Sequence, residues 1–466
     1  MKWLIELLER LIDQYMQQGA EFIDIRFQNN NSNNIHITDG RTRDIISAID
    51  KGIGIRVFIN GAWGFSSTNK LDKGSISNTM ESAFKIANII EEKAKIKFHL
   101  IEQPAYRKTV VFPQKKKLLD ISIEEKLNLA LSLDKQAKEF DERIVNTNIV
   151  YTDFVGDQTL LNSYGTLLEM KVNFIRIVST NYAYEAGVRQ RGYESIAGTA
   201  GFEITESEKA QNLGSLASKE AINLLKAVPV KAGKFDIIMD PSLTGVFIHE
   251  AFGHACEADA VLSGESILAD KMGSQVGLES VTIIDDPTLK GNYGYYPYDN
   301  EGTLSQKKLL VENGVLKNYL HSLETASRFN TQPTGNARAQ GYQNIPIVRM
   351  SNTYFKPATW KLEEMLEEVK HGLLLEGWVY GYTDPTKGAF TFKCRWAQTI
   401  EKGKCTTLLR DVSLSGMTLE ILNQIIAIGD SIEFSEGFCG KGGQSVPVTD
   451  GGPYLAVSKT VVGGSI

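Results

Sequence analysis

The chain has 466 residues, which is long enough for two or three domains. Hydrophobic residues make up 42% of it and aromatic residues 9%, an ordinary composition for a globular protein. Its 50 basic and 56 acidic side chains give a formal charge of −6, so there is no general attraction to nucleic acid or anionic membranes. Four cysteines without a C-x-x-C pair are too few for a disulfide framework. The first residues are interrupted by charges, unlike a secretory signal, and no run reaches the roughly 18–20 apolar residues of a membrane span. We expect a cytoplasmic protein without a nucleic-acid or membrane partner.

The first half of the chain alternates between helical and strand periodicity. Apolar residues at helical spacing, together with the capping box Ser122-x-x-Glu125, predict helices over 4–16, 75–93, 122–140 and 207–227. Period-2 patterns predict strands over 22–27, 34–37 and 54–59, followed by an antiparallel meander over 144–205. Turns are expected in the Asn-rich tract 29–34 and at 156–157 and 164–165.

A shift in composition at 228–233 marks the predicted boundary between two halves of the chain. Residues 1–228 are expected to form an N-terminal α+β region of two subdomains, with a break near 100–118. Residues 229–466 are expected to form a mainly antiparallel β domain, with a buried strand over 235–240 and helices over 242–260 and 362–374. The predicted fold class is therefore α+β, with a mixed sheet-and-helix half followed by a β-rich half.

His249, Glu250 and His254 form the most informative cluster in the sequence. Two of the six histidines lie here, five residues apart, and Glu250 directly follows the first. Imidazole is a common neutral zinc ligand, and a neighbouring carboxylate can take a proton from a metal-activated water. The same logic underlies the H-E-x-x-H motif of metalloproteases, from which this H-E-x-x-x-H differs by one residue.

The extra residue has a geometric consequence for the two histidines. In a regular α-helix, residues i and i+5 point about 140° apart, so both imidazoles can face one metal only if the helix contains a π-bulge. Gly253 is a credible place for that distortion. On spacing alone, two unrelated histidines are an equal alternative. Glu257 and Asp259 follow on the same segment, and the sequence leaves open whether they orient an imidazole or are solvated acids.

Cys439 lies in the glycine-rich stretch 437–453, which we expect to be a loop that approaches a ligand closely. Its thiol is expected to be less packed than that of Cys394, which lies in a strand-like segment. A thiolate would complete a His₂Cys site with one open position, as a catalytic zinc requires. Taken alone, Cys439 could equally be a nucleophile.

These residues resemble the signature of the TldD branch of the TldD/PmbA (TldD/TldE) family. The H-E-x-x-x-H segment with its following Glu257 and Asp259 is a specific match. Further matching segments occur in the same order along nearly the whole chain: 52–57, 299–303, 312–317, 384–390 and 439–448.

The resemblance implies a zinc-dependent peptidase of a family often described as modulators of DNA gyrase. It implies that His249, His254 and Cys439 bind the metal and that Glu250 is the general base. Family members trim unfolded or short peptides, including the leader of a peptide antibiotic and an unfolded antitoxin. They assemble as dimers in which PmbA-type partner subunits lack the motif that this chain keeps. Homodimerisation and pairing with a PmbA/TldE-type subunit both stay open.

Two other functions are compatible with the same residues. The first is a cysteine peptidase in which Cys439 is the nucleophile and His249 or His254 its base. The second is a peptide-binding subunit without activity, which captures extended chains by strand addition for a catalytic partner. The intact H-E-x-x-x-H motif argues against the second.

Overall fold

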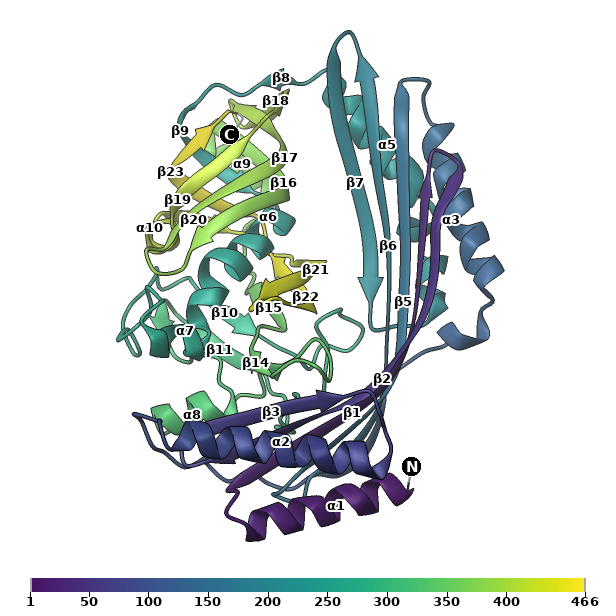
Figure 1. The fold of residues 1–466 in the computed structure, drawn as a ribbon. Helices are drawn as coiled ribbons and strands as arrows, with labels where there is room; N and C mark the ends of the chain where they lie inside the picture. The colour runs from purple at the N-terminus through teal and green to yellow at the C-terminus, as the bar shows by residue number, and fades with distance from the viewer. Residues whose placement is uncertain (1, 465–466) are drawn as a thin grey trace.

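The computed structural model describes residues 2–464 and has an α+β fold, as predicted (Figure 1). The described strands form sheets of seven, six, two and eight strands. All strands of the seven-stranded sheet precede residue 228, and the other sheets use strands that begin there or later. The domain limits 1–228 and 229–466 themselves stay a prediction. None of the described helices combines the length and the apolar character needed to cross a membrane.

The seven-stranded sheet has the order β3–β2–β1–β5–β6–β4, with β7 paired to β6. Its strands are β1 (Phe22–Thr38), β2 (Arg41–Ile59), β3 (Ala62–Thr68), β4 (Arg107–Val111), β5 (Ile144–Asn162), β6 (Leu167–Glu185) and β7 (Val188–Gly198). The helical segments of this half are α1 (Lys2–Gln17), α2 (Lys73–Glu91), η1 (Leu118–Asp120), α3 (Ile123–Lys138), η2 (Phe202–Glu206), α4 (Glu208–Gln211) and α5 (Leu213–Leu225). The four long helices α1, α2, α3 and α5 lie along the sheet (Figure 1).

Strand β1 shows why the sheet has a helical side and a polar side. Apolar side chains at odd-numbered positions face the helices: Ile23 and Ile25 pack in a core with α1 and α2, and Ile35 packs in a core with α3. Successive side chains of a strand point to opposite faces, so the even-numbered residues lie on the other face. These are the buried polar side chains of Asp24, Arg26, Gln28 and Asn30. That face is turned toward the second half of the chain, since Gln28 accepts a hydrogen bond from the Tyr342 amide at 2.9 Å.

Two predicted turns are wrong because long strands run through them. The Asn-rich tract lies inside β1, where the Asn33 and Asn34 amides donate to Asp153 and Thr152 of β5 at 2.9 and 3.0 Å. These cross-strand bonds compensate for the low strand propensity of asparagine. The expected turn at 156–157 is a continuous part of β5, whereas the turn at 164–165 is present between β5 and β6.

The second half contains two large sheets and one small one. The six-stranded sheet has the order β12–β11–β10–β15–β22–β21, and the eight-stranded sheet has the order β16–β9–β23–β19–β17–β18–β8, with β20 paired to β23. The strands are β8 (Val228–Pro229), β9 (Gly233–Met239), β10 (Ile283–Asp285), β11 (Lys308–Glu312), β12 (Val315–Leu316), β13 (Ala337–Arg338), β14 (Ile347–Val348), β15 (Asn352–Phe355), β16 (His371–Asp384), β17 (Ala389–Glu401), β18 (Lys404–Arg410), β19 (Ser413–Met417), β20 (Ile425–Ile428), β21 (Glu433–Lys441), β22 (Gln444–Gly452) and β23 (Leu455–Gly463).

The helices of this half are short, and two of them differ from the prediction. They are α6 (Pro241–Val246), η3 (Phe247–Gly253), η4 (His254–Cys256), α7 (Ala258–Ser263), α8 (Leu323–Phe329), α9 (Leu362–Val369) and α10 (Thr418–Asn423). The single helix expected over 242–260 is divided into four segments, which are in order an α-helix, a π-helix, a 3₁₀-helix and a second α-helix. The helix expected over 362–374 ends at Val369, because Lys370 takes a positive φ of 57° and β16 begins at His371. Segments α6 and η3 pack between β16 and β22, which places them between the two large sheets.

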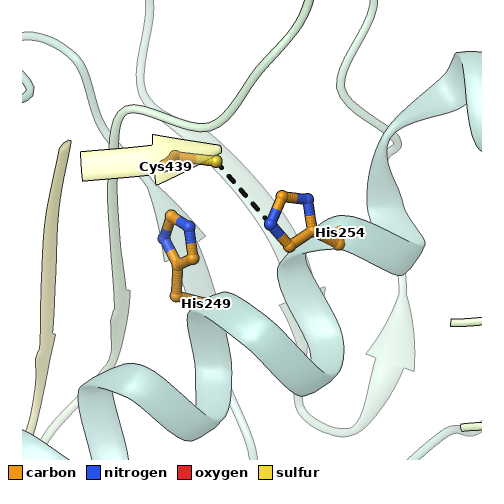
Figure 2. Close-up of side chains that lie close together, drawn as sticks. All are labelled: His249, His254 and Cys439. Atoms are coloured by element: carbon orange, nitrogen blue, oxygen red, sulfur yellow. Dashed lines mark hydrogen bonds between the residues drawn. The ribbon is translucent and has the colours of Figure 1, made fainter. Parts of the chain in front are cut away.

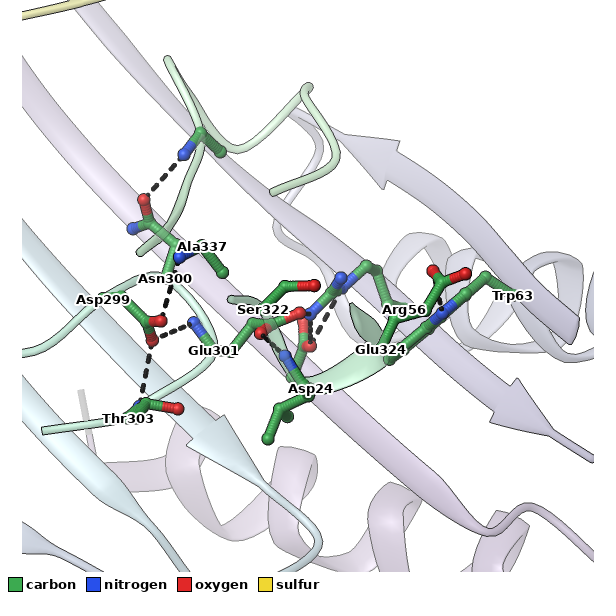
Figure 3. A network of polar contacts seen from close by, with 12 residues as sticks. Asp24, Arg56, Trp63, Asp299, Asn300, Glu301, Thr303, Ser322, Glu324 and Ala337 are labelled. Carbon is green, nitrogen blue, oxygen red and sulfur yellow. Dashed lines mark hydrogen bonds and ion pairs between the residues drawn. The ribbon is translucent and has the colours of Figure 1, made fainter. Parts of the chain in front are cut away.

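A buried ion cluster joins the two halves of the chain (Figure 3). Arg56 on β2 pairs with Asp24 on β1 and with Glu301 at 3.0 Å, and all three side chains are almost fully buried. Glu301 also accepts a hydrogen bond from the Leu323 amide at the start of α8 at 2.7 Å. Burial raises the pKa of Glu301, and Arg56 opposes that shift. The guanidinium therefore holds two carboxylates from different halves of the chain.

We predict that Arg56→Ala destabilises the protein by about 3–5 kcal/mol, because it leaves two buried carboxylates without their cation. Arg43→Ala removes an exposed arginine from the same strand and should change the free energy of unfolding by less than about 0.5 kcal/mol. Denaturant unfolding of both variants tests this. Equal effects of the two substitutions would show that the cluster does not join the halves.

Candidate metal centre

The helical segment that carries both histidines contains the extra residue that their spacing requires. Asp240 caps α6 by accepting a hydrogen bond from the Leu243 amide at 2.7 Å. The following segment η3 is a π-helix, and the His254 amide donates to the carbonyl of His249, five residues earlier. Gly253 lies in this turn because a Cβ there would be 2.1 Å from the Met350 sulfur. The π-helix that we predicted from the spacing is therefore confirmed.

Cys439 lies on strand β21 rather than in the loop that the glycines predicted. It pairs with Val446 of β22, and the turn of this hairpin lies at 442–443, where both glycines have positive φ. Its side chain is 1% exposed, as buried as that of Cys394, so the expected difference in packing is wrong. Arg349 donates a hydrogen bond to the Cys439 carbonyl, which fixes the strand beneath the thiol.

The hairpin brings the thiol of Cys439 to the two imidazoles (Figure 2). One donor atom from each of His249, His254 and Cys439 lies within 4.8 Å of the other two. The Cys439 sulfur is 3.6 Å from His254 Nε2, and the two imidazole planes are nearly perpendicular, with centroids 5.3 Å apart. Ligands of a tetrahedral zinc lie about 3.3–3.8 Å from one another, so small side-chain rotations would close this set around a metal.

A buried carboxylate holds His254 from the side opposite the thiol. Glu257 accepts a hydrogen bond from His254 Nδ1 at 2.9 Å and pairs with Lys441 at 3.0 Å. Lys441 also binds both oxygens of Asp259 at 2.7 Å. Glu257 therefore fixes the orientation of the imidazole and leaves Nε2 free to face Cys439. The sequence did not identify Lys441, although period-2 alternation along a strand would have placed it on the same face as Cys439.

The three candidate ligands stabilise one another's charged forms. Burial raises the pKa of the Cys439 thiol, but His249 and His254 overcome this and hold it well below its ordinary value. Burial lowers the pKa of both imidazoles, yet Cys439 raises that of His249, and Glu257 with Cys439 raises that of His254 well above normal. These shifts favour a thiolate next to imidazolium, and a thiolate is the form of cysteine that binds metals.

Glu250 is the most accessible member of the cluster. Its side chain is 33% exposed, and its Oε2 lies 3.9 Å from Nε2 of His254. The three candidate ligands are more buried than Glu250. Glu250 therefore lies at the most exposed side of the cluster.

Asp450 on β22 is a further acid next to the site that the sequence did not indicate. It lies against Gly245, four residues before His249, since a Cβ on Gly245 would be 2.9 Å from its Oδ1. The pKa of Asp450 is raised to about 7, chiefly by burial, which His249 opposes and the nearby carboxylate of Glu250 reinforces. No described residue donates a hydrogen bond to Oδ1. Only the pairing register of the β21–β22 hairpin, which sequence reasoning did not supply, would have placed it there.

The donor set fits a zinc ion. Two imidazoles and one thiolate leave one coordination position open, which is the composition of a catalytic rather than a structural zinc site. His249 is 3% exposed, and its Nδ1 has no hydrogen-bond partner among residues 2–464. The chemistry of the donor set, rather than this nitrogen, is what fits the metal.

Three family models together match most of the chain. The PmbA/TldA metallopeptidase domain 1 matches residues 23–87, the central domain of that family matches 116–225, and its C-terminal domain matches 232–464. The last match contains His249, His254 and Cys439.

The chain is also similar over its whole length to proteins named as metalloproteases. It is 40% identical to a metalloprotease of Methanocaldococcus jannaschii, with 98% of this chain and 99% of that protein aligned. It is 30% identical to a zinc metalloprotease TldD homolog of Saccharolobus solfataricus, with 96% and 98% aligned. The crystal structure of TldE from Thermococcus kodakarensis shares the fold, with a TM-score of 0.78 at 16% identity over 98% of this chain and 100% of that one.

We predict that the metal-free protein contains a thiolate at a pH of about 6.5, two units below the ordinary cysteine pKa of about 8.5. The ultraviolet absorbance of the thiolate, followed during a pH titration, measures this. Cys439→Ser should abolish the signal at low pH, whereas Cys405→Ser, at a half-buried cysteine whose pKa burial raises, should keep it. Absorbance that develops only above the ordinary pKa would contradict the ion pair described here.

Proposed function

The chain belongs to the PmbA/TldA metallopeptidase family, and on this premise we propose that it is a zinc-dependent peptidase. The observation that carries the proposal is the convergence of three donor atoms from His249, His254 and Cys439 within 4.8 Å. Glu250 lies directly beside them at the exposed side of the site. This set has the ligands of a catalytic zinc and a carboxylate free to act as a base.

In the proposed reaction Glu250 is the general base. A zinc ion held by His249, His254 and Cys439 would supply a Lewis acid that polarises the scissile carbonyl and acidifies the attacking water. Glu250 takes one proton from that water as its oxygen bonds to the carbonyl carbon. The C–N bond then breaks, and Glu250 returns the proton to the leaving amine. Glu257 and Lys441 keep the His254 imidazole in place throughout.

The substrate that fits this site is an unfolded or short peptide. Strand β21 carries Cys439 and pairs with β22 alone among the described strands, so its other edge presents free backbone groups. An extended peptide could add to this edge and pass the thiol of Cys439, gaining affinity from main-chain hydrogen bonds. Because those bonds do not depend on side chains, the enzyme should accept many sequences. A folded domain cannot present such a strand.

We also propose that the protein acts as a dimer in the cytoplasm, with a second copy or a PmbA/TldE-type subunit. The shared fold with a solved TldE supports the second kind of partner, since a chain of the same architecture could pack equivalently. All four cysteines are free, which is the usual state in a reducing compartment.

Cysteine peptidase chemistry is the second candidate, and the 3.6 Å contact of Cys439 with His254 favours it. Burial of the thiol argues against it, because a nucleophile must reach the substrate carbonyl. A chelator would inactivate the zinc enzyme and leave a cysteine peptidase active. A peptide-binding subunit without activity would need neither Glu250 nor three converging ligands.

We predict that Glu250→Gln keeps about one zinc per chain and lowers turnover by about 10²–10⁴-fold, the usual contribution of a positioned general base. His254→Ala should lose the metal, because two protein ligands rarely hold a catalytic zinc. Metal analysis and a peptidase assay on unfolded peptides, with the exposed Glu279→Gln as control, measure both effects. Full activity of Glu250→Gln with normal zinc would end the proposed mechanism.

We further predict that an unfolded chain is cleaved and the same sequence in its stable native fold is not. The physical reason is that only the unfolded form can add an extended strand beside β21. Cleavage of a small domain and of its destabilised variant, compared at equal concentration, measures the difference. Similar rates for both forms would refute this mode of binding.

A further inference from the structure

A cavity of about 430 Å³ lies between the seven-stranded sheet and the β21–β22 hairpin. One wall is the polar face of β1, including Asn30, and the adjoining faces of β5 and β6. Another wall is formed by the hairpin residues Phe438, Ser445, Val446 and Pro447. The exposed side chains of Asp50, Gln340 and Ser445 lie at its rim, so it opens to solvent there. The cavity is separate from the three candidate ligands, none of which lines it.

Aromatic side chains form much of the apolar part of the lining and connect the sheet to the hairpin. Phe154 stacks on Phe174 at 4.7 Å, Tyr293 meets Phe174 edge-on at 5.4 Å, and Tyr293 meets Phe438 edge-on at 5.3 Å. Ring faces and edges arranged in this way bind another ring well, because aromatic pairs gain from both stacked and edge-on contacts.

Two buried polar atoms in this lining have no partner among residues 2–464. They are Oδ1 of Asn30, a residue 7% exposed, and the hydroxyl of Tyr293, a residue 2% exposed. A buried acceptor without a donor is unfavourable, so a ligand that brings a hydroxyl or N–H group would be stabilised there. An aliphatic ligand would leave the Asn30 oxygen unpaired.

The cavity also lies next to the proposed site of cleavage. Phe438 lines it, and the next residue, Cys439, turns its side chain to the opposite face of β21, toward the histidines. Successive side chains of a peptide added beside β21 would likewise alternate between the metal side and the cavity side. A residue within about two positions of the scissile bond would thus place its side chain at the cavity, since one residue advances a strand by about 3.3 Å.

We propose that this cavity binds an aromatic side chain of the peptide substrate, within two residues of the cleaved bond, and that tyrosine is preferred there. The ring fills the aromatic lining, and its hydroxyl donates a hydrogen bond to Asn30 Oδ1. This inference rests on the proposed peptidase function and adds a side-chain preference to it.

A peptide series tests the proposal on the zinc-loaded, full-length protein. Peptides with one variable residue, scanned over the two positions on each side of the scissile bond, carry tyrosine, phenylalanine, leucine or alanine in an otherwise constant polar sequence. At one position, tyrosine should raise kcat/KM over alanine by about 10-fold or more, the usual effect of filling an apolar pocket. Tyrosine should exceed phenylalanine there by about 2- to 10-fold, the value of one hydrogen bond.

Matched variants connect the preference to the cavity. Val172→Phe fills the cavity from β6 and should bring the tyrosine-to-alanine ratio toward one, whereas Lys171→Phe adds the same ring at the neighbouring exposed position and should keep it. Asn30→Ala should remove the advantage of tyrosine over phenylalanine and keep that of phenylalanine over alanine. If Val172→Phe does not fold, Asn30→Ala still tests whether the side-chain preference depends on the cavity.

The outcomes separate this inference from the proposed function. Cleavage of all peptides at similar rates, or an aromatic preference that survives Val172→Phe, would overturn the side-chain pocket and leave the peptidase intact. Absence of cleavage of every peptide by the zinc-loaded protein would overturn the proposed function instead. Binding of the same peptides to zinc-loaded Glu250→Gln then tests the pocket by itself, with the same order of affinities expected. Equal affinities would overturn it.

Discussion

The one extra residue in the helical turn between His249 and His254 is the constraint on which the candidate site depends. A regular α-helix would place these imidazoles about 140° apart. The π-turn closed by the His254 amide on the His249 carbonyl brings them to one side. Such turns are rare, and this one is held between two sheets, with Gly253 directly against Met350. Strand β21 places Cys439 opposite the side of the helical segment on which both imidazoles lie.

The second half of the chain supplies the candidate ligands, but both halves shape the surroundings of the site. The polar face of β1 is buried against the second half, and the Arg56 cluster fixes that contact. Where the two surfaces do not meet, they enclose the aromatic cavity behind the β21–β22 hairpin. The same hairpin thus has the candidate metal ligand on one face and a candidate side-chain pocket on the other.

The sequence predicted which residues come together in the candidate site more accurately than it predicted the secondary structure around them. The fold class followed from hydrophobic periodicity, and the π-turn was the condition under which histidines five residues apart could bind one metal. The glycines and asparagines led to wrong predictions, because Cys439 lies in a strand of a β-hairpin and the tract 29–34 lies in a strand that pairs with the distant β5. Asp450 was not found because its place depends on the register of the β21–β22 hairpin, and Lys441 was missed because its segment was taken for a loop rather than a strand.

The central claim is that His249, His254 and Cys439 hold one zinc ion. X-ray absorption at the zinc edge of the purified, metal-loaded protein tests it most directly, because it reports ligand types and distances without reference to activity. We predict one sulfur at about 2.3 Å, and two imidazole nitrogens at about 2.0–2.1 Å with a further light atom, in a tetrahedral site. A zinc site without sulfur, or a fully active protein without zinc, would contradict the account.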